Sequence, residues 1–301
     1  MTILPRLFFG DNQFFGVNHM SEERARAQAM RFSTTRSMIE VLEAAYDEGI
    51  KAFMCTTHER IGEICQHVRD HPRQYPDFQL YPCMPYGVKY ATAVTDDGII
   101  GALKRFLPQE GAFGALVKGG LALATRDVKG IGELLIDAEM KMFQGLDTPV
   151  IFLQNLVTDL LLGLGMHEAL RIFAQHVRRR YHAEPGYITM NLPRLLDALE
   201  ALGLENPIVC ASINKAGFRM CGGIAAYEKA IATRRFQPIA MSVMASGAIA
   251  PREALEYVCA QPNIGSIVFG ASSRANIRET RALVQELDRG ADLRPQEAVA
   301  A

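Results

Sequence analysis

Short apolar runs alternate with longer amphipathic stretches along this chain. An apolar run bounded by turn residues predicts a buried strand, whereas apolar residues spaced along one face predict a helix. In Thr34–Glu48, for example, the apolar residues Met38, Val41, Leu42 and Ala45 fall on one helical face. Eight runs predict strands: Arg6–Gly10, Lys51–Thr56, Gln79–Met84, Val150–Asn155, Gly186–Met190, Ile208–Ile213, Pro238–Met244 and Ser266–Gly270.

Helical patterns lie between these runs, an alternation typical of parallel β/α units. The predicted helices are Thr34–Glu48, Glu59–His71, Ala124–Phe143, Asp159–Arg180, Pro193–Leu202, Ile224–Thr233 and Ala275–Asp288. With 301 residues, the chain suits one large α/β barrel, which takes about 250 residues. We therefore predict a single (β/α)8 TIM barrel over residues 1–290, with a frayed tail at 291–301.

The stretch between the third and fourth predicted strands is longer than an ordinary crossover. We predict a helical insertion over about 92–145, either a lid or a packed elaboration of the barrel. Its glycine-rich part, Gly111–Gly120, is compatible with a ninth strand, but we interpret it as short helices and turns.

Composition narrows the class of function. A net charge of −1 gives no reason to expect a nucleic-acid partner, and no apolar stretch approaches the roughly 20 residues of a membrane span. The N-terminus lacks the pattern of a signal peptide, and the six cysteines form no CxxC pair. We expect a cytoplasmic protein with free thiols and a small-molecule substrate. The oligomeric state stays open, with a homo-oligomer among the possibilities.

The last strand and helix carry a pattern typical of phosphate binding. The apolar run ends at Gly270, and Ser272, Ser273, Arg274 and Asn276 then open the last predicted helix. Small residues let the backbone approach a phosphate, a helix N-terminus attracts it, and Arg274 and Arg278 supply positive charge. The alternative is an ordinary N-cap, because serine is preferred there.

In a barrel of this kind the chemistry lies where the strands end. The first strand is followed by the polar triplet Asp11, Asn12 and Gln13, which two phenylalanine pairs bracket. Core packing explains the phenylalanines but not the triplet, so Asp11 is a candidate acid/base or ligand-positioning residue. Further polar side chains that follow strands are Thr56, His58, Glu59, Tyr86, Lys89, Gln154, Asn155, Asn191, Ser212, Asn214, Lys215, Ser242 and Ser246.

Four stretches resemble the aldo-keto reductases in order and spacing. Ala44–Phe53 resembles the helix and turn before that family's second strand, and Ile188–Asn191 lies where the family has a Ser-Asn pair that contacts the nicotinamide. Pro238–Gly247 with Pro251–Leu255 resembles the seventh strand and the helix beyond it. Gln261–Gly270 with Arg274–Thr280 resembles the strand and helix that hold the adenosine phosphate.

The resemblance implies an NADP-linked oxidoreductase, but the family's catalytic tetrad is not matched. Met54 falls where the family has its aspartate, and His58 or Glu59 where it has its acid tyrosine. Met84 or Pro85 stands at the lysine, with Lys89 just beyond, and Gln154 or Asn155 at the histidine. We therefore expect an enzyme that acts on a small carbonyl or hydroxyl compound with a non-standard acid/base.

These observations assign roles to the residues at the strand ends. His58 is the leading acid/base, because imidazole titrates near neutrality, and Glu59 would orient it. In the alternative, Thr57 caps the following helix and His58 and Glu59 only decorate its first turn. The predicted catalytic residues are His58, Asp11, Glu59, Lys89 and Lys215. The predicted cofactor-binding residues are Asn191, Ser242, Gly270, Ser272, Ser273, Arg274 and Asn276. The predicted substrate-binding residues are Asn12, Gln13, Cys55, Tyr86, Gln154, Asn155 and Asn214.

Other chemistries stay open at this point. Lys215 at the end of the sixth strand is a candidate Schiff-base lysine of a lyase or aldolase. Cys55 is a candidate nucleophile if a positive neighbour activates its thiol. His19, Cys55, His58, Glu59 and Cys83 could converge on a metal ion, but their spacing matches no compact ligand motif, and we predict no metal. A non-catalytic nucleotide-binding barrel is the remaining alternative.

Overall fold

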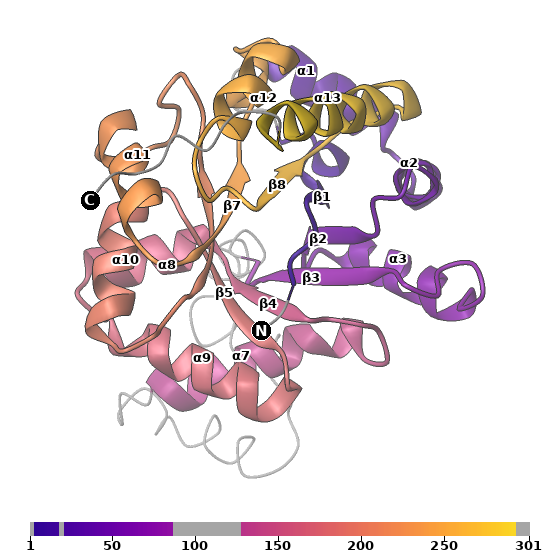
Figure 1. Ribbon diagram of the computed structural model, residues 1–301. Coiled ribbons are helices and arrows are strands. Elements are labelled where there is room, and N and C mark those ends of the chain that lie inside the picture. Colours follow the sequence, from indigo (N-terminus) through magenta and orange to yellow (C-terminus); the bar gives the residue numbers. More distant parts are fainter. Residues whose placement is uncertain (1–2, 18–20, 87–127, 293–301) are drawn as a thin grey trace, which may run out of the picture.

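A computed structural model describes residues 3–17, 21–86 and 128–292. Eight parallel strands form a closed barrel in chain order, and β8 pairs with β1 (Figure 1). The strands are β1 (Leu7–Gly10), β2 (Ala52–Thr56), β3 (Gln79–Met84), β4 (Val150–Leu153), β5 (Glu184–Thr189), β6 (Ile208–Ser212), β7 (Gln237–Met241) and β8 (Ser266–Phe269). The prediction of a (β/α)8 TIM barrel is confirmed, with all eight predicted strands in place.

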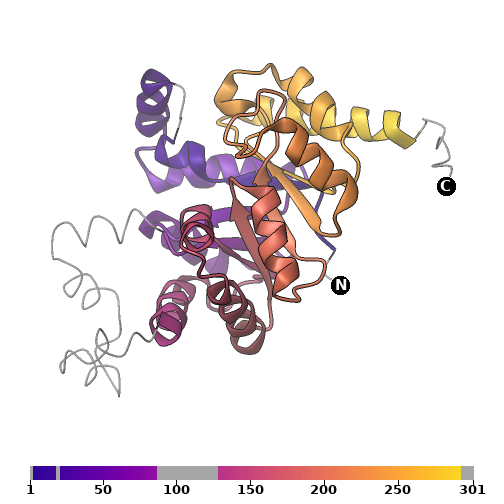
Figure 2. The same cartoon turned by 90° about the vertical axis from the view of Figure 1, so that its left-hand side faces the viewer.

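Helices surround the barrel in both views (Figures 1 and 2). They are α1 (Glu22–Arg31), α2 (Thr35–Asp47), α3 (Glu59–Asp70), α7 (Val128–Met140), α8 (Asn155–Gly163), α9 (Glu168–Tyr181), α10 (Leu192–Ala201), α11 (Ile224–Thr233), α12 (Pro251–Cys259) and α13 (Arg274–Asp292). Short 3₁₀ turns are η1 (Asn12–Phe15), η2 (Lys141–Phe143) and η3 (Ala245–Gly247). The predicted apolar face of α2 is buried, as its spacing required.

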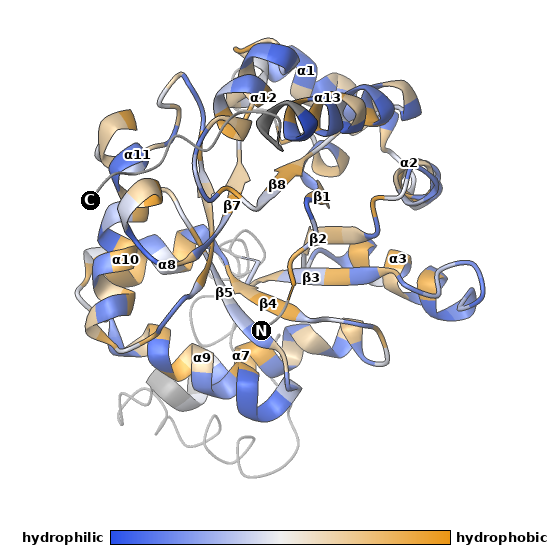
Figure 3. Cartoon of the chain, viewed as in Figure 1, coloured by the Kyte–Doolittle hydropathy of each residue, from blue (hydrophilic) through white to orange (hydrophobic). Residues whose placement is uncertain are grey.

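Two apolar layers hold the barrel together. Alternate strand residues face its interior, where large and small side chains interdigitate. These residues are Phe8, Ala52, Met54, Tyr81, Cys83, Val150, Phe152, Ile188, Ile208, Cys210 and Ile239. The second layer lies between the outer face of the strands and the helices. Figure 3 shows apolar colouring along the strands and more polar colouring on the helices. The barrel interior is therefore a packed core, and a ligand has room only at its ends.

The first and last segments of the barrel are joined to each other. Leu7 pairs with Ile267 across the β1–β8 seam. Arg6 donates to both carboxylate oxygens of Asp288 in α13, at 2.7 and 3.0 Å. Ser266 Oγ donates to the carbonyl of Pro5 at 2.7 Å. Closure thus depends on contacts between residues more than 250 positions apart.

Two sequence predictions of helices need correction. Asp159–Arg180 is not one helix: α8 ends at Gly163, and Gly165 adopts a left-handed φ of 69° before α9 begins. Helix α1 was not predicted, because none of its residues is buried and it therefore has no apolar face.

The insertion is described only in part. Helix α7 lies inside the predicted helix Ala124–Phe143. Residues 87–127, which include Lys89 and Gly111–Gly120, lie outside the described residues, as do His19 and residues 293–301.

Two expectations from composition are also addressed by the structure. All six cysteines have free thiols, as predicted. Of the helices that the structure describes, none combines the length and apolar character needed to cross a membrane.

Candidate active site at the carboxyl end of the barrel

Asp11 follows β1 directly and is buried, with only 5% of its surface exposed. Its Oδ2 accepts hydrogen bonds from the backbone N–H and the hydroxyl of Thr56, both at 2.7 Å, at the end of β2. Burial raises the pKa of Asp11 to about 6, and the two bonds from Thr56 only partly oppose that rise. A carboxyl group that titrates near neutrality at the end of a barrel strand is suited to proton transfer.

Two aromatic rings and an imidazole lie together where β1, β2 and β3 end. The His58 ring lies between Phe15, with ring centroids 4.2 Å apart, and Tyr86, with centroids 5.8 Å apart. Burial, followed by the charge of Asp11, raises the pKa of Tyr86. The structure therefore brings Asp11, His58 and Tyr86 together at the ends of β1, β2 and β3.

His58 also has a structural task. It is the N-cap of α3, and its Nδ1 accepts a hydrogen bond from the backbone N–H of Arg60 at 3.1 Å. In the alternative considered from the sequence, Thr57 was the cap, but the Thr57 hydroxyl donates instead to Glu139. Since Nδ1 is the acceptor, the neutral ring carries its proton on Nε2. Protonating Nδ1 would break the cap, so His58 is less suited than Asp11 to exchange a proton.

This geometry makes a stability prediction for His58. We expect His58→Ala to lower the free energy of unfolding by about 1 kcal/mol, the usual cost of losing an N-cap side chain. His58→Asn should lower it less, because asparagine is a preferred cap. Chemical denaturation of the three proteins measures both effects, and equal losses in the two variants would contradict the capping role.

Glu139 in α7 joins the same site and was not predicted. Its buried carboxylate accepts from the Thr57 hydroxyl at 2.6 Å and from the backbone N–H of Tyr86 at 3.2 Å. It therefore anchors the turns that carry His58 and Tyr86. No sequence signal identified it, because its partners lie 82 and 53 positions away.

The loops after β5, β6 and β7 contribute further polar groups. Asn191 is half-buried, and its backbone N–H donates to Thr189 Oγ1 at 2.8 Å. Ser212 and Ser242 approach each other, with their hydroxyl oxygens 3.4 Å apart. Ser242, Ala245 and Ser246 all have positive φ, between 46° and 58°. Non-glycine residues in this region store strain, which clusters at functional sites.

Several predicted substrate-binding residues have other surroundings. Asn214 is fully buried, and its side-chain amide is bonded at both ends to the backbone of Phe218, so it holds its own loop. Cys55 is fully buried, and burial raises its pKa well above the ordinary value, which is opposite to an activated thiolate. Asn12 is exposed, as is Glu59, which was predicted as a catalytic residue, whereas Gln154 and Asn155 are half-buried at the start of α8.

The described residues offer no metal centre. Within 3–17, 21–86 and 128–292, no three His, Cys, Asp or Glu side chains are grouped so as to hold a metal ion. A cleft of about 300 Å³ lies at the other end of the barrel, lined by Leu7, Ala52 and Gln79 at the starts of three strands and by Arg6, Arg281 and Asp288. That end of a TIM barrel ordinarily serves stability.

Comparison with known proteins gives structural similarity alone. No protein-family model matches the sequence, and no curated protein sequence matches it. A Pseudomonas aeruginosa protein described as an aldo-keto reductase superposes with a TM-score of 0.58 at 13% identity, covering 94% of this chain and 90% of that one. The aldo-keto reductase of Bacillus halodurans, in its holo form, superposes with a TM-score of 0.52 at 14% sequence identity. The superposition covers 98% of this chain and 93% of that one. The aldose reductase of Giardia lamblia superposes with a TM-score of 0.50 at 12% sequence identity, covering 96% of this chain and 92% of that one.

This chain has the aldo-keto reductase fold. Met54, which the sequence comparison aligned with the catalytic aspartate of aldo-keto reductases, packs in the barrel interior. Asp11, one strand earlier, places a buried carboxyl group at this end of the fold.

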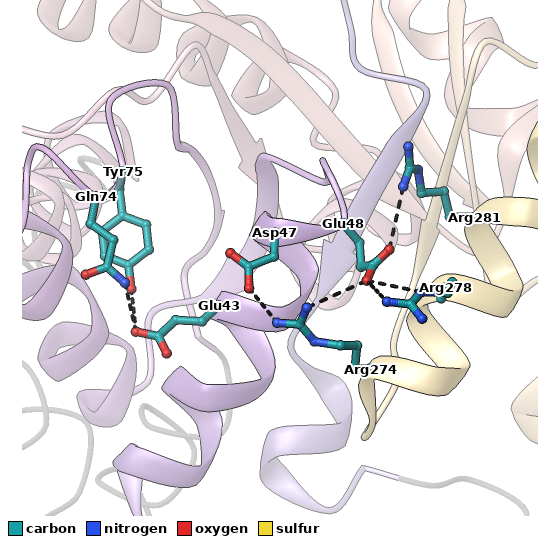
Figure 4. Close-up of polar contacts among 8 residues, drawn as sticks. All are labelled: Glu43, Asp47, Glu48, Gln74, Tyr75, Arg274, Arg278 and Arg281. Atoms are coloured by element: carbon teal, nitrogen blue, oxygen red, sulfur yellow. Dashed lines mark hydrogen bonds and ion pairs between the residues drawn. The ribbon is translucent and has the colours of Figure 1, made fainter.

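The segment predicted to hold phosphate in this aldo-keto reductase fold has partners within the chain. A Cβ on Gly270 would lie 2.1 Å from Gln13 Oε1, so the Gln13 side chain already occupies the space beside this glycine. Ser273 Oγ accepts from the backbone N–H of Asn276 at 3.3 Å, as an N-cap does. Arg274 and Arg278 form ion pairs with Asp47 and Glu48 of the α2 end (Figure 4).

Lys215 does not have the surroundings of a Schiff-base lysine. Its side chain is 57% exposed and forms a 2.8 Å ion pair with Glu253. The hydrogen bond and charge of Glu253 raise the pKa of Lys215, whereas a nucleophilic lysine needs a lowered pKa.

Proposed function

We propose that this chain is an oxidoreductase that interconverts a small carbonyl compound and its hydroxyl counterpart, with a nicotinamide cofactor and with Asp11 as the acid/base. The observation that carries the proposal is the buried carboxyl group of Asp11, with a pKa of about 6, at the end of β1. The fold of the structural neighbours supports the reaction class by analogy only, since fold does not determine function.

The proposed roles follow from chemistry. Reducing a carbonyl group needs a hydride at carbon and a proton at oxygen, and a bound nicotinamide would supply the hydride. Protonated Asp11 would donate the proton in reduction, and its carboxylate would accept it in oxidation. The two bonds from Thr56 fix the orientation of the carboxyl group, so little reorganisation would accompany the transfer.

The neighbouring rings suggest the size of the substrate. Phe15, His58 and Tyr86 would form an apolar and aromatic wall beside Asp11, a setting that suits a compact substrate with few charged groups. Asn191 and Ser242, at the ends of β5 and β7, would hold the amide of the nicotinamide.

Cofactor binding is the first test of this proposal. Purified protein is titrated with NADH and with NADPH by calorimetry and by nucleotide fluorescence, which suits a chain without tryptophan. We expect saturable binding of at least one nucleotide, followed by turnover when small aldehydes, ketones and sugar acids are screened. The absence of binding at millimolar nucleotide would contradict the proposal, and binding without turnover would favour a non-catalytic nucleotide-binding barrel.

A reducing compartment fits this proposal. All six cysteines are free thiols, and Cys221 is exposed, which suits the cytoplasm.

A further inference from the structure

One arginine at the carboxyl end of the barrel has no partner for its charge. Arg219 lies in the loop between β6 and α11 and is half-buried. Its guanidinium carbon lies 5.5 Å from the centroid of the Phe218 ring, so an aromatic face covers one side of the group. Among residues 3–17, 21–86 and 128–292, no acceptor or carboxylate bonds to its N–H donors. Five donors of a fixed fork are therefore left for a ligand.

The pKa of Arg219 reflects this isolation. Burial lowers it from its ordinary value, and no carboxylate of the described residues opposes that shift. In Arg171, Arg252 and Arg278, by contrast, a hydrogen bond to a glutamate raises the pKa. A guanidinium stays protonated at neutral pH, so Arg219 carries a positive charge that is partly removed from water and is not neutralised. An anion bound there would remove this cost.

The loop around Arg219 is fixed on both sides. Asn214 Oδ1 accepts from the backbone N–H of Phe218 at 2.8 Å, and Asn214 Nδ2 donates to the carbonyl of Phe218 at 2.9 Å. Met220 is buried beneath the loop, where its sulfur accepts from the backbone N–H of Asn214. Arg219 itself has a φ of 56°, a left-handed value that non-glycine residues seldom adopt. Such conformations persist where neighbouring contacts enforce them, and they cluster at ligand sites.

This loop borders the positions proposed to hold the nicotinamide. The backbone N–H of Cys221 donates to the carbonyl of Met190 at 2.8 Å, which joins the loop to the end of β5 beside Asn191. On its other side lies the end of β7 with Ser242, because β6 pairs with both strands. In a barrel of eight strands closed in chain order, β6 lies across the mouth from β2. A group held by this loop would therefore face Asp11 from the opposite side of the mouth.

A single guanidinium matches a carboxylate in charge and in shape. Its planar fork binds the two carboxylate oxygens with parallel hydrogen bonds. A phosphate monoester carries about −1.5 to −2 charges near neutral pH and would need a second cation. The other cation of this loop, Lys215, is already paired with Glu253 at 2.8 Å. The surroundings of Arg219 therefore favour a carboxylate over a phosphate.

We propose that Arg219 is a specificity-determining residue that binds a carboxylate of the substrate, so that the enzyme interconverts a small oxo acid and the corresponding hydroxy acid. The inference rests on the proposed function for its reaction class. One carboxylate at Arg219 is compatible with an otherwise apolar substrate beside Phe15, His58 and Tyr86. The carboxylate site itself is testable without any turnover.

The test compares the wild type with Arg219→Met, Arg219→Lys and the control Arg194→Met. Methionine keeps much of the length of the side chain without its charge, and lysine keeps the charge without the fork. Arg194 is exposed on the first turn of α10, at the same end of the barrel, so its variant removes an equal charge. Calorimetry measures binding of propanoate, butanoate and hexanoate, of their neutral amides and of inorganic phosphate, each with and without NADH or NADPH. Circular dichroism checks that each variant is folded.

We expect the wild type to bind at least one carboxylate about tenfold or more tightly than the matching amide. Arg219→Met should weaken that binding by about tenfold to 100-fold, the usual effect of losing hydrogen bonds to a charged group. Arg219→Lys should weaken it less, and Arg194→Met should leave it unchanged. In turnover, kcat/KM for oxo acids should fall in the same order, whereas kcat/KM for neutral aldehydes and ketones should not change.

Two results would overturn the inference: carboxylate affinity that is equal in the wild type and Arg219→Met, or no carboxylate bound at tens of millimolar. Tighter binding of inorganic phosphate than of every carboxylate would also reject it. Turnover of neutral carbonyl compounds that Arg219→Met leaves unchanged, without turnover of oxo acids, would reject the inference and leave the proposed function intact. If no nucleotide binds, the proposed function fails, and the carboxylate titrations without nucleotide decide whether Arg219 forms an anion site.

Discussion

Replacing Asp11 with asparagine should lower turnover by about 10²- to 10⁴-fold, the range that a positioned acid/base supplies. Asparagine has nearly the same shape but exchanges no proton. In the wild type, the reduction rate should fall as pH rises through about 6, because the donor is then deprotonated, and the oxidation rate should rise over the same interval. Both inflections should be absent from the variant. The measurement is kcat/KM from pH 5 to pH 8 in each direction.

The same substitution has a thermodynamic signature that needs no substrate. Since the pKa of Asp11 is raised from 3.8 to about 6, the folded protein holds a proton that the unfolded chain releases. The free energy of unfolding should therefore fall as pH rises from about 4 to about 6, by roughly 3 kcal/mol in total. Urea denaturation at pH 4, 5, 6 and 7 should show this loss for the wild type relative to Asp11→Asn. A difference between the two proteins that is constant with pH would show that Asp11 titrates normally.

Phe152→Ala should lower the free energy of unfolding by about 3 to 5 kcal/mol, the usual cost of deleting a buried phenylalanine ring. Phe152 is fully buried in the barrel interior and lies across Gly186 of the neighbouring strand. A Cβ on Gly186 would lie 2.4 Å from two carbons of that ring. The ring thus fills the space that the absent side chain leaves.

This contact predicts a coupling that a double-mutant cycle measures. Gly186→Ala alone should cost about 1 to 3 kcal/mol by overpacking. In the Phe152→Ala background its cost should shrink by at least about 0.5 kcal/mol, because the new methyl group enters the vacated space. Gly62→Ala in α3 is the control, since nothing lies within 4 Å of a Cβ there, and it should be neutral or stabilising. Additive costs for the Phe152 and Gly186 changes would contradict the predicted packing.

The fold could be predicted from the sequence because the patterns that specify each strand and helix are local. Each strand is a short apolar run, and each helix that packs on the barrel has one apolar face, as in α2. Helix α1 was not predicted because it buries no side chain, although Ser21 and the two glutamates after it form a typical helix N-terminus. Helices α8 and α9 were predicted as one helix because the spacing of apolar residues continues across Gly163 and Gly165.

Only part of the candidate site could be predicted from the sequence, because the contacts that form it join residues far apart in the chain. The sequence singled out Asp11 as a polar residue that core packing does not explain, and burial raises its pKa to about 6. No pattern linked Glu139 to Tyr86, or Glu48 to Arg278 at a separation of 230 positions. The arginines of the predicted phosphate site could be identified from the sequence, but the carboxylates that pair with them could not.

The seam between β1 and β8 has a consequence for synthesis of the chain. Until Ser266–Phe269 leaves the ribosome, β1 and β7 are open sheet edges, and neither Arg6 nor the carbonyl of Pro5 has its partner. Exposed edges of parallel strands invite pairing with other chains, and non-local pairings form slowly. A nascent chain that stalls before residue 266 should therefore require chaperones, whereas synthesis of β8 and α13 should close the barrel in one cooperative step.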